Sequence, residues 1–101
     1  MLDYERRHQT VTVRLANELD HRAATQLKGE LDSLLADRSI RRLVLDLQRL
    51  KFMDSSGIGL IIGRYKQMAR RGGSVAVINP DAHMDRIFQM AGLYELVERM
   101  A

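Results

Sequence analysis

The spacing of apolar residues predicts four β-strands within residues 4–78. Residues 10–15, TVTVRL, alternate between apolar and polar side chains, which is the period of a half-buried strand. A weaker strand at residues 4–7 would pair with it as an antiparallel hairpin. Residues 41–50, RRLVLDLQRL, also alternate and indicate a strand covered on at least one side. Residues 74–78, SVAVI, are apolar almost throughout, as is typical of a strand buried in a parallel sheet.

A spacing of three and four predicts helices between these strands. After Asp20, which can cap a helix start, apolar residues recur in this way up to about Asp37. A second helix is expected at residues 56–71, stopped by the glycines at 72 and 73, because glycine readily adopts the left-handed geometry of a helix end. A third is expected from residue 81 to residue 90, and residues 93–100, LYELVERM, would form a last short strand.

This order of elements predicts an α/β fold. Strands that alternate with helices imply right-handed crossovers, so we expect a mixed, mainly parallel sheet of about four to five strands with helices packed on it. The chain has 101 residues and shows no internal repeat or linker, which indicates a single domain spanning residues 1–101. In such sheets, ligands and partners tend to meet at the loops after the strands.

The composition excludes several classes of chemistry. The chain has no cysteine, so it has no disulfide, thiolate metal site or cysteine nucleophile, and this suits a reducing compartment. The charged N-terminus does not resemble a signal peptide, and no apolar run approaches the roughly 20 residues that span a bilayer. We therefore expect a cytoplasmic protein that does not bind a membrane.

Arginine dominates the positive charge. The formal net charge is +3, from 13 arginines and three lysines against 13 acidic residues. Basic pairs occur at residues 6–7, 41–42 and 70–71, but they are dispersed along the sequence and only five aromatic residues accompany them. A base-stacking platform needs interleaved aromatic residues. We interpret the pairs as solvated surface and expect no direct contact with nucleic acid.

The stretch FMDSSGIG, at residues 52–59, has three possible explanations. Serine and aspartate are preferred helix caps, but one cap does not explain Asp54, Ser55 and Ser56 in series. A nucleophilic Ser55, with His21 or Asp54 as its base, lacks the G-x-S-x-G elbow, and the glycines match neither phosphate-binding pattern. The third explanation is a serine that another protein modifies.

A helical wheel of the second predicted helix suggests a docking surface. At about 100° per residue, one face gathers the apolar side chains that should meet the sheet. These are Ile58, Ile61, Ile62, Tyr65, Met68 and Ala69. Ser56, Leu60, Gly63 and Gln67 fall opposite and predict an uncharged, exposed ridge that suits a partner protein, with Arg64 at its side.

Three segments of the sequence carry a resemblance to a known family: FMDSSGIGLIIGRYKQM, ELDH near the first helix, and GLYELV after the last helix. They resemble the anti-sigma factor antagonists, which are small bacterial members of the STAS domain family. The sporulation-type antagonist is the most similar type. The resemblance implies a STAS-type fold and a partner-switching mechanism. The unphosphorylated protein binds an anti-sigma factor that is also a serine kinase and frees its sigma factor. That kinase, using its own ATP, then phosphorylates Ser55, and a serine phosphatase reverses the change.

On this resemblance the chain is a binder and a kinase substrate, monomeric when free, with no catalytic residue, cofactor or metal of its own. Asp20 matches the acid of the family's G-E-L-D motif, whose loop should lie beside Ser55. The expected partner-binding residues are Asp20, Asp54, Ser56, Gly57, Leu60, Gly63 and Gln67.

The sequence departs from the family pattern in two places. Asn17 replaces the glycine of G-E-L-D, and asparagine also tolerates left-handed geometry. The family typically carries one more helix after the last strand, and we expect it to be absent here, because the sequence ends at Ala101. Two other hypotheses stay open: a stand-alone STAS subunit of a membrane ABC transport complex, and a hydrolase that uses Ser55.

Overall fold

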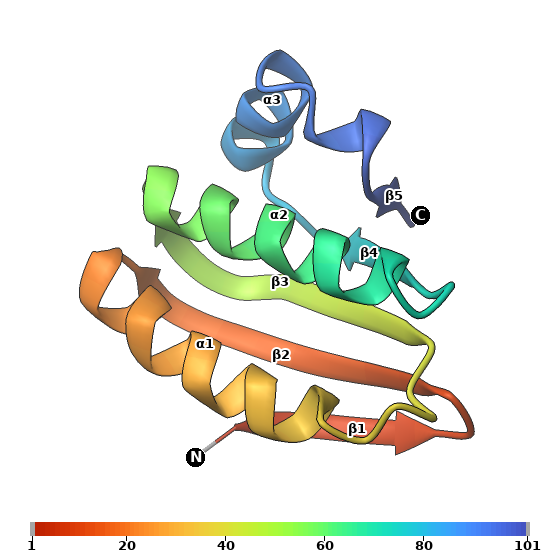
Figure 1. The fold of residues 1–101 in the computed structure, drawn as a ribbon. Helices are drawn as coiled ribbons and strands as arrows, with labels where there is room; N and C mark the ends of the chain where they lie inside the picture. The colour runs from red at the N-terminus through yellow and green to blue at the C-terminus, as the bar shows by residue number, and fades with distance from the viewer. Residues whose placement is uncertain (1, 101) are drawn as a thin grey trace.

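Five strands form one mixed sheet in the computed structural model, which describes residues 2–100 (Figure 1). The strands are β1 (Asp3–Arg7), β2 (Thr10–Leu19), β3 (Arg42–Met53), β4 (Ser74–Ile78) and β5 (Glu98–Arg99), and they lie side by side in this order. The β1–β2 pair is antiparallel and the other three pairs are parallel. The predicted α/β class, the N-terminal hairpin and the mainly parallel sheet are confirmed.

The three helices are α1 (His21–Leu35), α2 (Ser55–Ala69) and α3 (Ala82–Met90). Each begins immediately after an aspartate whose carboxylate accepts a backbone N–H bond of the first turn, at 2.9 Å for Asp20 and Asp54 and 2.7 Å for Asp81. Figure 1 shows α1 and α2 side by side over one face of the sheet, with α3 beyond β4. The local capping signals therefore placed the helix starts well.

The core lies between the sheet and the helices. Parallel register aligns Val11 with Leu43 and Leu43 with Val75, so one face of three strands presents a continuous apolar row. These side chains are at most 2% exposed, and the helices cover them with leucine, isoleucine and methionine. The contributing helical residues include Leu27, Leu31, Leu35, Ile61, Met68, Met84 and Phe88.

Strand β2 runs beyond the predicted residues 10–15, as far as Leu19. Its pairing with β3 shifts register twice, between Arg14 and Ala16 and again between Asn17 and Glu18. Asn17 lies between these shifts with a φ of 65°, so the prediction that asparagine here adopts left-handed geometry is confirmed. The irregular backbone breaks the apolar alternation, which is why the sequence pattern predicted too short a strand.

The C-terminal segment differs from the prediction of one strand at residues 93–100. It forms a short 3₁₀ helix, Leu93–Glu95, and only then the two-residue β5. Gly92, at a φ of 73°, turns the chain so that Leu93 and Val97 both enter the core, and a spacing of four suits a helical turn. The Phe88 and Tyr94 rings pack edge to face, with centroids 6.0 Å apart.

Met1 and Ala101, the ends of the predicted 1–101 domain, lie outside the described residues, and so does anything that would follow residue 100. Within residues 2–100, none of the helices combines the length and the apolar character that crossing a membrane requires.

Candidate functional site

Ser55 is the first residue of α2 and stands at the carboxyl end of β3. Its side chain is exposed, and its hydroxyl has no hydrogen-bond partner among the residues that the structure describes. Asp54 precedes it as the N-cap, with its carboxylate engaged by the backbone N–H of Ser56. Asp54 therefore caps the helix, and the hydroxyl of Ser55 takes no part in the cap. This leaves Ser55 accessible to another molecule.

Asp20 lies on the same side of the molecule, as its position after β2 predicts. Leu19 pairs with Met53 at the ends of β2 and β3, and the backbone N–H of Asp54 donates to the Leu19 carbonyl at 3.4 Å. Asp20 and Asp54 are thus the next residues on two neighbouring strands, and each caps the helix that follows. Two helix N-termini, each with partial positive charge, lie next to each other beside Ser55.

Gly57 is buried rather than exposed. A β-carbon at this position would overlap the side chain of Met53 and lie 3.1 Å from the Leu19 side chain. The glycine lets the first turn of α2 pack closely on the ends of β2 and β3. Its position in the motif has a packing reason independent of any partner.

The predicted exposed ridge is wrong. Leu60 is only 7% exposed and belongs to the core, whereas Ala69, which was expected to face the sheet, is exposed. Ser56, Gly63 and Gln67 are half-buried. The helical wheel assumed a single buried face on the sheet, but α2 also packs against α1, and this second contact covers the side that carries Leu60.

Arg64 is also buried, at 7% exposure, although it was expected at the side of an exposed ridge. Its Nη1 lies 3.4 Å from Oδ1 of Asp32 on α1, an ion pair between the two helices. Within residues 2–100, its Nε and Nη1 have no hydrogen-bond partner. The guanidinium is therefore held between α1 and α2 by charge and packing more than by hydrogen bonds.

A shallow groove between α1 and α2 replaces the ridge. Its walls come from His21, Ala24, Thr25 and Lys28 on α1 and from Ser56, Gly59, Leu60, Gly63 and Arg64 on α2. The α1 wall could not be predicted from the sequence, because no local signal tells which helix lies beside α2. The structure thus brings Ser56, Leu60 and Gly63 together as expected, but as the floor and edge of a groove.

His21 approaches Ser56 and not Ser55. The distance from Nδ1 of His21 to Oγ of Ser56 is 3.4 Å, a long contact at the mouth of the groove. The histidine that was considered as a base for a nucleophilic Ser55 therefore has the neighbouring hydroxyl as its partner. Asp54, the other candidate base, accepts the backbone N–H of Ser56 at its Oδ1 and so serves as the helix cap.

The comparisons with known proteins agree with this geometry. The STAS domain model matches residues 1–101. An anti-sigma F factor antagonist of Paenibacillus polymyxa is 38% identical over 98 residues, which cover 95% of this chain and 82% of that protein. An anti-sigma-B factor antagonist of Bacillus subtilis is 27% identical over 96% of this chain and 87% of its own length.

Solved structures show the same fold. The anti-sigma factor antagonist SpoIIAA in its unphosphorylated form superposes with a TM-score of 0.80 at 29% identity, over all of this chain and 88% of that chain. The Bacillus cell fate determinant SpoIIAA in its phosphorylated form gives a TM-score of 0.78 at 30% identity, over all of this chain and 92% of that one. The chain therefore belongs to the STAS domain family and is related to its anti-sigma factor antagonists.

Proposed function

We propose that this protein is a phosphorylation-controlled anti-sigma factor antagonist and that Ser55 is its switch. In the unphosphorylated state it binds an anti-sigma factor and so releases the sigma factor. The observation that carries this proposal is the exposed, unpaired hydroxyl of Ser55 at the start of α2, in a chain related to an antagonist solved in both phosphorylated and unphosphorylated forms.

Phosphorylation at this position should leave the fold intact. A phosphoserine adds about −1.5 to −2 charges at pH 7. The N-termini of α1 and α2 both lie beside Ser55, and the partial positive charge of a helix N-terminus favours an anion. Since the Ser55 side chain makes no hydrogen bond within residues 2–100 that the phosphate would break, the modification changes the surface rather than the core.

The switch would act when the partner docks. Asp20 and Asp54 already carry negative charge at this edge, and a phosphate beside them must lose water when a partner covers it. One uncompensated charge at an interface costs about 2 to 5 kcal/mol, which is roughly a thirtyfold or greater loss of affinity. Phosphorylation should therefore weaken the complex without unfolding either protein.

The partner would supply the chemistry. The anti-sigma factor is proposed to be a serine kinase that holds the ATP, and a separate serine phosphatase would remove the phosphate. On this proposal the chain is a substrate and not an enzyme, and it needs no cofactor.

The contact surface would include Asp20, Asp54, Ser56 and Gly63 at its edge. Gly57 and Leu60 are buried and would shape this surface through packing beneath it.

The test begins with the purified chain, a candidate anti-sigma factor with serine kinase activity, and ATP, followed by mass mapping of the product. We expect one phosphate, on Ser55. Binding of the unmodified partner is then compared between Ser55→Ala and Ser55→Asp. The first should bind like the parent chain, and the second should bind at least about thirtyfold more weakly.

Ser33→Asp is the matched control, since it adds the same charge at an exposed serine of α1 remote from the helix start. Its affinity for the partner should stay within about twofold of the parent. Equal affinities of Ser55→Ala and Ser55→Asp would contradict the switch. Phosphate on another residue would contradict the site.

A further inference from the structure

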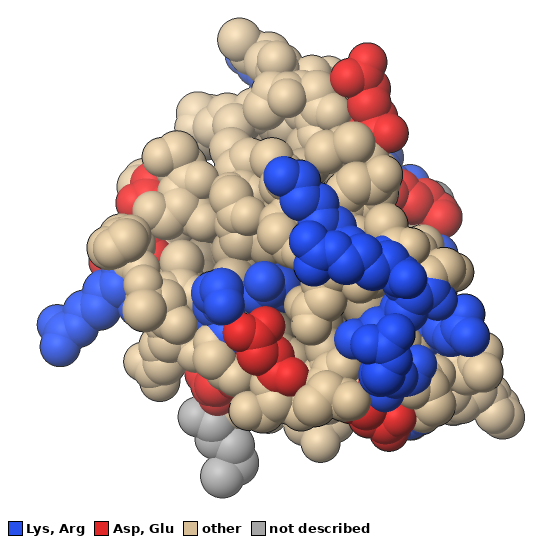
Figure 2. Space-filling model, in the orientation of Figure 1, with Lys and Arg blue, Asp and Glu red and all other residues tan. Residues whose placement is uncertain are grey.

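The three arginine pairs that are dispersed in the sequence converge at one end of the molecule, opposite Ser55. Thr10, Arg42 and Ser74 are paired across β2, β3 and β4, so the segments that precede these strands are neighbours. Arg41 donates to the carbonyl of Arg71 at 2.8 Å, and Arg6 reaches Asp37 in the loop before β3. Figure 2 shows Lys and Arg side chains as a continuous band over this end. The pairs are therefore dispersed along the sequence but lie together in the fold.

We call this surface the basic end. It consists of the pairs Arg6 and Arg7, Arg41 and Arg42, and Arg70 and Arg71, joined by Arg38 before β3 and Lys66 in the last turn of α2. The same region holds two carboxylates, Asp37 and Glu98, which pair with Arg6 and Arg42 at 2.6 and 3.0 Å. Eight cations and two anions leave a net charge of +6, whereas the rest of the chain carries −3.

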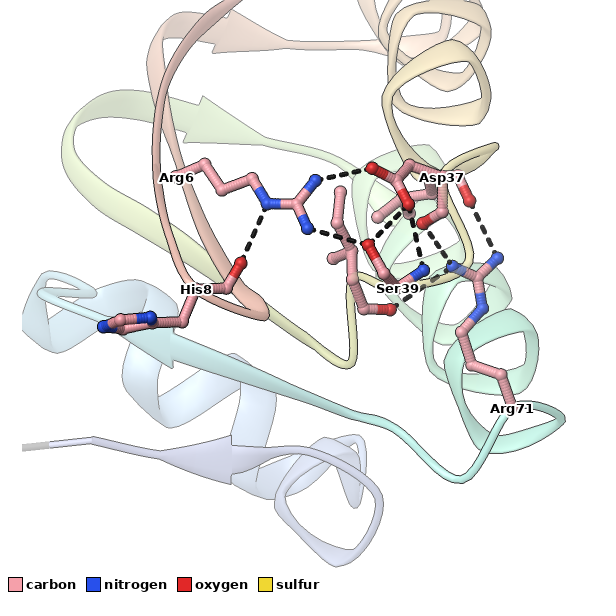
Figure 3. A network of polar contacts seen from close by, with 7 residues as sticks. Arg6, His8, Asp37, Ser39 and Arg71 are labelled. Atoms are coloured by element: carbon pink, nitrogen blue, oxygen red, sulfur yellow. Dashed lines mark hydrogen bonds and ion pairs between the residues drawn. The ribbon is translucent and has the colours of Figure 1, made fainter.

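Part of this charge has a structural role. Figure 3 shows Arg6, Ser39 and Arg71 gathered around Asp37. Arg71 donates to the carbonyls of Leu35, Asp37 and Ile40, at 2.8 to 3.4 Å, and so satisfies the C-terminal end of α1. The C-termini of α1 and α2 together contribute about one negative charge. A surplus of about five positive charges remains.

The remaining cations are exposed and unpaired. Within residues 2–100, the side chains of Arg7, Arg38 and Arg70 have no hydrogen bond or salt bridge. Seven of the eight cations are arginines, whose planar guanidinium groups bind carboxylates through two parallel bonds. The hydrogen bonds around Asp37 hold the backbone of the loop that carries Arg38, which limits the backbone entropy lost when a partner binds.

The backbone at this end gives phosphate groups no advantage over carboxylates. Phosphates bind best where free N–H groups of a helix N-terminus add to the charge, but α1 and α2 both begin at the opposite end and direct their C-terminal carbonyls here. Carboxylates spaced along a peptide can pair with individual arginines, whereas the residues that define the basic end include no aromatic side chain on which a nucleic-acid base could stack. We propose that the basic end binds an acidic, Asp- and Glu-rich segment of a partner protein.

This surface is separate from the switch. Ser55 and Ala69 mark the two ends of α2, a helix of 15 residues and about 20 Å length. A protein bound at the basic end need not touch Ser55, so the two sites can be occupied together. Binding at the basic end should accordingly be the same for Ser55→Ala and Ser55→Asp, which separates this inference from the proposed function.

The probe is a fluorescently labelled peptide with about ten glutamates separated by serine and glycine, titrated with the full chain at about 50 mM and 200 mM salt. We expect saturable binding that weakens with salt. The double variant Arg38→Glu/Arg70→Glu should weaken it at least about tenfold. Arg49→Glu/Arg86→Glu, at two exposed arginines outside the basic end, makes the same change in net charge and should alter it no more than about twofold.

Melting curves of both double variants check that they fold. Absence of peptide binding at low salt would overturn the inference, and so would an equal loss in the two double variants, since that would reflect net charge alone.

A 20-base-pair DNA duplex is titrated in parallel. If it binds more tightly than the peptide and loses affinity in Arg38→Glu/Arg70→Glu, the basic end is a nucleic-acid surface and the acidic-partner assignment fails.

Discussion

The hydroxyl of Ser56 lies 3.4 Å from Nδ1 of His21, while the hydroxyl of Ser55, one residue earlier, has no partner within the described residues. The two serines of the motif therefore have different surroundings. Ser56 is half-buried at the mouth of the α1–α2 groove, and Ser55 faces solvent.

This difference predicts separate effects of the two alanine variants. Ser56→Ala removes only a long, partly exposed contact, so the free energy of unfolding should fall by no more than about 1 kcal/mol. Kinase-dependent phosphate should remain on Ser55 in this variant and disappear in Ser55→Ala. Urea unfolding and mass mapping measure the two quantities. Unchanged phosphate incorporation by Ser55→Ala would show that Ser55 is not the acceptor.

The two capping aspartates allow capping to be distinguished from partner contact. Asp20→Ala and Asp54→Ala should each lower the free energy of unfolding by about 1 kcal/mol, because a first-turn N–H loses its acceptor. Asparagine retains a capping oxygen, so Asp20→Asn should restore most of that stability. If Asp20→Asn is as stable as the parent but binds the anti-sigma factor more weakly, the carboxylate also serves the interface. If Asp20→Asn binds the anti-sigma factor as tightly as the parent chain, Asp20 serves only as a helix cap.

Leu60 tests which face of α2 is buried. Leu60→Ala should lower the free energy of unfolding by about 2 to 4 kcal/mol, since it removes a side chain from the contact between α1 and α2. Leu96→Ala is the control, because Leu96 is 40% exposed and should lose less than about 1 kcal/mol. Similar small losses in both variants would favour the exposed ridge that the helical wheel predicts.

The glycines of the motif should differ in their response to alanine. Gly57→Ala should destabilise the protein by about 1 to 3 kcal/mol, because the new methyl group overlaps Met53. A methyl group at Gly59 meets nothing within 4 Å, so Gly59→Ala should gain about 0.5 to 1 kcal/mol from higher helix propensity. Denaturant unfolding of the two variants measures whether each change lowers or raises the free energy of unfolding. A loss of stability in Gly59→Ala would contradict the open space around this glycine.

Asp37 should make stability depend on acid pH. Hydrogen bonds from Ser39, and then from Arg6, hold the pKa of Asp37 well below its ordinary value. A carboxylate with a lowered pKa stabilises the fold fully above its unfolded pKa, about 4, and loses this effect as the pH falls further. Asp37→Asn should therefore lower the melting temperature at pH 7, and the difference from the parent should shrink between pH 4 and pH 2. Glu18→Gln is the control variant, since Glu18 is an exposed carboxylate that makes no salt bridge within residues 2–100.

Local signals predicted most of the fold. The aspartates that start the helices act on N–H groups two or three residues away, and the alternation in residues 10–15 and 41–50 depends only on the strand period. The motif around Ser55 also located the candidate switch, because a helix start after a parallel strand has a defined side in this fold. These features involve residues close together in the sequence, so they do not depend on contacts with residues far away in the sequence.

The tertiary structure alone decided what α2 exposes and where the arginines meet. Leu60 is buried because α1, more than 20 positions earlier in the sequence, lies beside α2, and hydrophobic periodicity cannot report a second packing partner. The basic end exists because parallel strand register brings the segments before β2, β3 and β4 together. The sequence by itself therefore determined most of the elements, the helix caps and the position of the D-S-S-G motif at a helix start, whereas the groove and the basic end follow from contacts between elements that no local pattern encodes.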